Sequence, residues 1–168
     1  MTPAGGTGDM FLLVKGARTG LIKGEAQDSV HGGEIAVLSW SWGMQQSRSS
    51  NAGQARGKAT IQDLKIVKMV DSASTPLMSA LRTNESIQKA VLTLRKAGKG
   101  QLEYLRITIE NGRVVSLVLD GGTPPGSAQV VEQVSFSFNK LLVEYIPQGK
   151  DGQGGGGMVF QDEYGDAQ

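Results

Sequence analysis

His31 is the only histidine of this 168-residue chain, and it follows two other groups that could take part in hydrolysis. Asp28, Ser29 and His31 offer the carboxylate, hydroxyl and imidazole of a nucleophilic triad. Their closeness in sequence does not create triad geometry, because the fold must place the three groups. We therefore favour a structural or capping role for His31, and the sequence predicts no catalytic residue.

Two glycine-rich stretches resemble nucleotide-binding motifs. Residues 152–157 fit the pattern G-x-G-x-x-G, but no helix follows them, as a dinucleotide site requires. Residues 53–59 resemble a phosphate-binding loop that is one residue short and lacks the hydroxyl that would hold Mg²⁺. The acidic pair Asp162 and Glu163 lies in a polar tail, where no cleft is expected. The sequence therefore predicts no cofactor, no metal site and no enzyme.

The composition indicates one domain that is held together by packing and hydrogen bonds. The chain has no cysteine, which excludes disulfides and thiolate metal ligands. Seventeen basic and sixteen acidic residues nearly balance, whereas a nucleic-acid binder usually carries a basic excess. The N-terminus does not have the pattern of a signal peptide, and no apolar run approaches the roughly 20 residues of a membrane span. We expect synthesis in the cytoplasm without a signal peptide, no nucleic-acid partner and no membrane insertion.

Short alternating segments predict a mainly β fold with about eight mostly antiparallel strands. These segments are residues 9–15, 34–45, 58–70, 88–95, 102–110, 113–119 and 130–145. A change of phase near residues 62–63 indicates a bulge. One helix is expected to begin at a cap on Ser74 or Thr75, with Pro76 in its first turn and Asn84 at its stop. Together these elements predict a β-barrel with one α-helix packed alongside.

Asn111 and Gly112 are the strongest turn signal of the chain, because both residue types tolerate the positive φ of a two-residue hairpin. We expect them to join residues 102–110 to residues 113–119. Both of these segments carry apolar residues on both faces, so the second face requires cover from another element or another subunit. The hairpin is therefore predicted to make a subunit contact, through Tyr104, Ile107, Val115 and Leu117.

Both tryptophans, Trp40 and Trp42, lie two residues apart and hence on one face of a predicted strand. Aromatic residues at this spacing are more often core or interface anchors than the walls of a ligand pocket. We assign the same role to Phe136, Phe138 and Tyr145 in the last predicted strand.

Three blocks of the chain carry a likeness to a known family. They are residues 9–12 followed by Gly16, residues 24–43 (GEAQDSVHGGEIAVLSWSWG) and residues 132–148 (EQVSFSFNKLLVEYIPQ). In these blocks the sequence resembles the hemolysin-coregulated protein (Hcp) family, the tube-forming component of bacterial type VI secretion systems. The resemblance divides the chain into a flexible N-terminus at 1–8, an Hcp-like β-barrel domain at 9–147 and a Gly-rich C-terminal tail at 148–168.

The resemblance implies a structural protein that assembles as a hexameric ring. Rings would stack into the inner tube that a contractile sheath propels from a Gram-negative cell, so the protein would be secreted into the medium or into target cells. The implied partners are further copies of this chain, the sheath, spike and baseplate proteins, and small effectors that the lumen carries or chaperones. By position, a loop between early strands would contact the next ring, through Arg48, Asn51, Arg56 and Lys58.

Three other interpretations stay open. A phage-like contractile tail tube protein would share the features of a secretion tube. A small secreted effector enzyme would depend on His31. A bare β-barrel that binds a small ligand would require an apolar cavity within one subunit.

Overall fold

The computed structural model describes residues 9–46, 59–97, 102–122, 124–148 and 156–165. The strands are β1 (Asp9–Gly16), β2 (Gly20–Ile22), β3 (Ile35–Ala36), β4 (Ser39–Ser41), β5 (Met44–Gln46), β6 (Ala59–Ile61), β7 (Leu64–Met69), β8 (Ile87–Arg95), β9 (Glu103–Gly121), β10 (Val130–Ser137), β11 (Lys140–Tyr145) and β12 (Met158–Glu163). The helix is α1 (Ser74–Arg82). The strand pairs in the described residues are antiparallel, so the predicted mainly β fold with one helix is confirmed.

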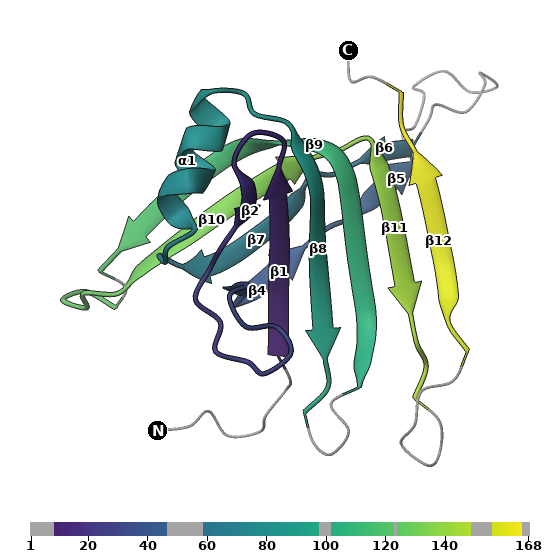
Figure 1. Ribbon diagram of the computed structural model, residues 1–168, viewed down its shortest axis with the longest axis horizontal. Helices are drawn as coiled ribbons and strands as arrows, with labels where there is room; N and C mark the ends of the chain where they lie inside the picture. The colour runs from purple at the N-terminus through teal and green to yellow at the C-terminus, as the bar shows by residue number, and fades with distance from the viewer. Residues whose placement is uncertain (1–8, 47–58, 98–101, 123, 149–155, 166–168) are drawn as a thin grey trace.

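Ten strands form one sheet that is folded into two layers (Figure 1). The first layer has the order β12-β11-β9-β8-β1, with β2 and β3 on the far edge of β1. The second layer has the order β9-β10-β7-β4, and β5 pairs with β6 in a separate small sheet. The path through the large sheet runs from β2 to β4 without closing. The described strands thus form a folded open sheet, and the expected barrel is not closed within one chain.

Strand β9 belongs to both layers and corrects the predicted hairpin. Its first half pairs with β8 and β11, while its second half pairs with β10. Asn111 has a φ of 54°, but Gly112 lacks the positive φ that the predicted turn also required, and the chain bends there without reversing. A Cβ on Gly112 would overlap the backbone oxygen of Ser137, so only glycine fits this corner. The hairpin prediction was wrong because residues 102–119 pair with other strands and not with each other.

The hydrophobic core lies between the two layers. Alternate residues of β1, β8 and β9 point into it from the first layer, including Leu12, Leu92 and Ile107. Phe136 and Ile66 reach it from the second layer and are fully buried. This burial explains why the two layers stay together without any disulfide.

Two long predicted strands are divided in the structure. Residues 58–70 separate into β6 and β7 at Gln62 and Asp63, where the change of phase had indicated a bulge. The two parts enter different sheets, which is a larger break than one bulge. Residues 34–45 form three short strands, β3, β4 and β5, and not one continuous strand.

Helix α1 contacts β9 and buries Leu77 and Ala80. Its N-cap is Ala73, which makes no side-chain cap bond, so the predicted cap by Ser74 or Thr75 was wrong. The Ser74 hydroxyl instead accepts hydrogen bonds from the Asp71 amide and the Lys68 ammonium. Asn84 has a φ of 56° just after the helix, which agrees with its predicted role as the stop.

A charged pair lies fully buried beside the start of α1. The Lys68 ammonium is 2.9 Å from Oε1 of Glu132, and both side chains have no exposed surface. Lys68 also contacts Asp71 at 2.8 Å. Alternation in β7 places Lys68 on the same face as Leu64 and Ile66, so the chain must pair its charge internally.

The region treated as a Gly-rich tail contains strand β12, which the sequence analysis did not predict. It pairs with β11 over its whole length, from Lys140 opposite Glu163 to Tyr145 opposite Met158. Within the described ranges, no helix has both the length and the apolar character needed to cross a membrane.

Candidate assembly surfaces

Strand β12 forms an edge of the first layer with exposed apolar side chains. Among the described strands it pairs only with β11, so its outer backbone groups have no strand partner there. Met158, Val159 and Phe160 are 64%, 63% and 44% exposed. Tyr145, opposite Met158 on β11, is 42% exposed. We call these four residues the β12 surface; an exposed apolar strand edge is a site at which another chain can add.

A second apolar edge lies at the end of β9. Beyond Gly112, β9 pairs on one side only with β10 in the described part of the chain. Val115, Val118 and Leu119 are 44%, 46% and 46% exposed. We call these three residues the β9 surface. Figure 1 shows that this end of β9 projects on the opposite side of the molecule from β12.

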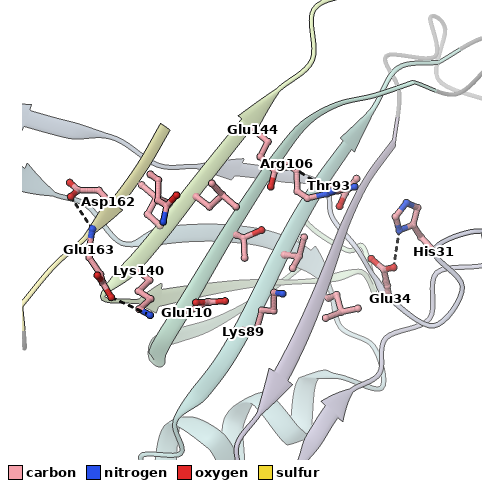
Figure 2. Close-up of a pocket in the computed structure, with 16 residues that line it drawn as sticks. His31, Glu34, Lys89, Thr93, Arg106, Glu110, Lys140, Glu144, Asp162 and Glu163 are labelled. Carbon is pink, nitrogen blue, oxygen red and sulfur yellow. Dashed lines mark hydrogen bonds and ion pairs between the residues drawn. The ribbon is translucent and has the colours of Figure 1, made fainter. Parts of the chain in front are cut away.

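The outer face of the first layer forms an open groove of about 990 Å³ (Figure 2). One row of side chains crosses it from β8 to β12 in register and alternates in charge: Lys89, Glu110, Lys140 and Glu163. The Lys140 ammonium is 3.2 Å from Glu163. Cross-strand neighbours of opposite charge stabilise a sheet and keep this face hydrated.

A neutral row runs beside the charged one. It consists of one residue from each of five neighbouring strands, and each residue lies opposite the next in register: Leu13, Val91, Thr108, Leu142 and Gln161. A further charged pair follows on the other side, where Arg106 lies 3.7 Å from Glu144. The groove therefore presents a narrow neutral strip between two charged borders (Figure 2).

His31 closes one end of the groove and is held by two carboxylates. Its Nδ1 lies 2.8 Å from Glu34 and its Nε2 lies 2.5 Å from Glu103. Burial alone would lower the pKa of His31, but the hydrogen bonds to Glu103 and Glu34 raise it above its usual value of 6.5. The imidazole stacks on Phe11 with the ring centroids 4.6 Å apart. This arrangement makes His31 a bridge between the loop at 23–34 and β9, which agrees with the structural role that we favoured.

Arg95 supports the same loop and also lies over the Phe11 ring. Its guanidinium lies 5.0 Å from the centre of the Phe11 ring and donates two hydrogen bonds to Asp28. A third hydrogen bond reaches Asp9 at 2.8 Å. The hydrogen bonds from Arg95, Val30 and His31 hold the pKa of Asp28 far below its usual range. Asp28 is therefore engaged by Arg95 and by backbone amides, and the imidazole of His31 has Glu34 and Glu103 as its partners.

The proposed stacking residues Arg48, Asn51, Arg56 and Lys58 lie outside the described residues, so their role stays a prediction. The proposed anchors differ among themselves. Phe136 is a buried core residue, and Trp40, Trp42 and Phe138 are half-buried against the core. Tyr145 is exposed and belongs to the β12 surface.

The four residues of the predicted contact hairpin do not act as a unit. Ile107 is buried in the core, and Tyr104 and Leu117 are half-buried against it. Val115 is exposed on the β9 surface. A subunit contact remains a prediction for the second half of β9, whereas the first half is covered by its own chain.

Sequence reasoning missed the β12 surface and the Arg95 cluster. The run Met158-Val159-Phe160 was a signal for a strand, but the preceding glycines and the following acids suggested a tail. In the sequence, Arg95 is only the last residue of the predicted strand at 88–95, and the alternation of that strand points it outward, whereas in the structure it is buried. Its partners Asp9 and Asp28 are 86 and 67 residues away in sequence, which no local pattern reveals.

Comparisons with known proteins agree on one family. Residues 11–145 match the family described as type VI secretion system effector, Hcp. The chain is 41% identical to protein Hcp1 of Pseudomonas aeruginosa over 154 residues, which cover 90% of this chain and 91% of that protein.

Solved structures give the same result. Hcp1 from Salmonella typhimurium superposes with a TM-score of 0.75 and 31% identity, covering 93% of this chain and 94% of that one. A type VI secretion system effector from Yersinia pestis superposes with a TM-score of 0.72 and 26% identity, covering 92% and 99%. The chain belongs to the Hcp family of type VI secretion proteins. It is accordingly a tube protein of that system.

Proposed function

We propose that this protein is the ring-forming subunit of a type VI inner tube. Six copies close a ring, the rings stack, and the tube leaves the cell with small effector proteins in its channel. The observation that carries this proposal is the 41% identity to Hcp1 of P. aeruginosa across nine-tenths of both chains. The alternatives of a phage tail tube, a hydrolase and a ligand-binding barrel have no comparable support.

The two apolar edges support a ring. They lie on opposite sides of the subunit, so each copy can contact one neighbour with each edge (Figure 1). A contact between two different surfaces is head-to-tail, and it generates a closed ring when its rotation returns to the first copy. The sheet that stays open in a single chain would then be continued by the neighbouring copies.

We further propose that the groove of the first layer lines the channel. When both edges are occupied by neighbours, the polar outer face of this layer is left free. Its mixed charges and its neutral strip suit a hydrated wall that holds a passing protein without binding it tightly. Small effector proteins would lie against this wall.

Other partners belong to the machine around the tube. In this proposal Arg48, Asn51, Arg56 and Lys58 contact the next ring, and the sheath, spike and baseplate proteins surround and terminate the stack. Replacing Arg56 and Lys58 together by glutamate should leave single rings intact and reduce their stacking. Loss of the rings themselves would show that this loop acts within a ring.

The ring is tested by native mass spectrometry and negative-stain electron microscopy of the purified chain. We expect one hexameric species and round particles with a central hole. Uniform monomers at high protein concentration would contradict the proposal. Secretion is tested by the appearance of the protein in the medium of cells with an intact type VI system and its absence when the sheath is deleted.

The channel wall is tested by a cysteine at Val91, because the chain contains no other cysteine. In assembled rings a small maleimide should label Val91→Cys, whereas a maleimide on a long polymer should label it slowly. Equal labelling by both reagents in rings would place the groove on the outside.

A further inference from the structure

The two apolar edges match each other in length, polarity and charge. The β12 surface is followed by Asp162 and Glu163, so β12 has an apolar start and an acidic end. The second half of β9 begins at the exposed Arg113, continues through Val115, Val118 and Leu119, and then reaches Asp120. The backbone of Arg113 pairs with Ser137, but its side chain makes no hydrogen bond or ion pair with the described residues. Glu163 is partly neutralised by Lys140.

Charge selects one relative direction for these strands. In an antiparallel contact the acidic end of β12 lies beside Arg113, and Met158 lies beside Val118 and Leu119. In a parallel contact Asp162 and Glu163 would lie beside Asp120 and repel it. The antiparallel direction also places the apolar residues of the two edges opposite one another.

We infer that β12 of one copy docks antiparallel along residues 113–120 of the next copy, and that this contact is the centre of the ring interface. The inference rests on the proposed ring, for which it names the two contacting surfaces. Each partner is a second copy of this chain, because the complementary edge is present on the same molecule. A stable interface buries more than about 1,000 Å², so the strand contact is surrounded by further contacts such as Tyr145.

The first test is a mixing experiment with two single variants. Phe160→Asp disables the β12 surface and Leu119→Asp disables the β9 surface, and each variant alone should be monomeric. An equal mixture retains one intact surface on each variant, so it should form 1:1 dimers and no rings. Leu81→Asp, on an exposed part of α1, is the matched control and should form normal rings.

The second test is a disulfide between copies in this cysteine-free chain. The double variant Val118→Cys and Met158→Cys, which places the two cysteines opposite each other in this alignment, should cross-link into closed oligomers under mild oxidation. The pair Leu81→Cys and Met158→Cys should not. This test does not depend on disrupting the fold.

The third test reverses the charges. Arg113→Glu should weaken assembly by up to about fivefold, the range expected for an exposed ion pair. Adding Asp162→Lys and Glu163→Lys should restore it. The rescue separates a direct charge contact from loss of folding in one variant.

The outcomes distinguish the inference from the proposed function. Rings that form normally with Phe160→Asp and with Leu119→Asp would overturn the named surfaces and leave the ring intact. An absence of the Val118 to Met158 cross-link in wild-type-like rings would overturn them as well. A wild-type chain that stays monomeric at high concentration would overturn both.

Discussion

His31 shows how one residue holds a long loop to the sheet. The groups facing it are Glu34 on its own loop and Glu103 on β9, and Glu103 is also held by Arg106 at 2.9 Å. The raised pKa of His31 means that the folded chain binds this proton more tightly than the unfolded chain. The resulting stabilisation is complete below pH 6.5 and is lost as the pH rises through the folded-state pKa.

We expect the free energy of unfolding to fall as the pH rises above 6.5, and to fall less in His31→Gln. Urea unfolding at several values between about pH 6 and pH 9 measures this difference. Since the chain has a single histidine, its NMR titration gives the folded-state pKa without ambiguity. A titration at or below 6.5 would contradict the expectation.

The Lys68–Glu132 pair is a second residue-scale feature, because neither side chain has exposed surface. Removing one partner leaves the other charge buried and unpaired. Lys68→Met should therefore reduce the free energy of unfolding by about 3–5 kcal/mol. Denaturant unfolding checks this value.

The double variant Lys68→Met with Glu132→Leu is the control for that prediction. It removes both charges, so most of the lost stability should return. A double variant that is as unstable as Lys68→Met alone would show that the unpaired Glu132 carboxylate does not cause the loss, and that packing or the loss of the Lys68 contact with Asp71 does.

At the scale of elements, the bend of β9 at Asn111 and Gly112 connects the two layers. Gly112→Ala would push a methyl group against the backbone oxygen of Ser137. We expect a loss of about 1–3 kcal/mol in the free energy of unfolding, as for overpacking in a core. Gly121→Ala on the same strand is the control, because its Cβ would have ordinary contacts no closer than 3.7 Å. Similar losses in both variants would mean that the corner is not the cause.

The same bend shows how far the sequence could predict the fold. The pair Asn111-Gly112 correctly indicated a positive φ at Asn111, since that preference is local, but not at Gly112. Whether the chain reverses or merely bends depends on which strands pair with residues 103–121, and those pairings are long-range. The helix, its stop at Asn84 and the break in the strand at Gln62 and Asp63 could also be predicted, because they depend on local sequence patterns.

Strand β12 and the partners of Lys68 could not be predicted, because they depend on contacts between residues far apart in the sequence. Met158, Val159 and Phe160 become a strand only because β11 offers a free edge. In the sequence, Lys68 is only one residue of an alternating strand, and its partner Glu132 is 64 residues away. The sequence therefore indicated one residue of each candidate assembly surface, Val115 and Tyr145. The other residues of these surfaces were found only in the structure.

At the scale of the whole molecule, the two apolar edges make assembly sensitive to defective copies. A Phe160→Asp chain can join a growing arc with its β9 surface but offers nothing to the next copy. Adding it to wild-type chains should reduce closed rings more than in proportion to its amount. Native mass spectrometry of mixtures at increasing ratios measures this loss, with Leu81→Asp as the inert addition. A loss of closed rings that is only proportional to the fraction of Phe160→Asp chains would argue against a ring that needs every contact between neighbours.

One consequence of the shared strand β9 concerns how the subunit comes apart. Because β9 supplies backbone partners to both layers, we expect the two layers to unfold together. Unfolding should then be a single cooperative event. In the proposed secretion tube, such a subunit would resist partial fraying, and it would be either fully folded or fully unfolded.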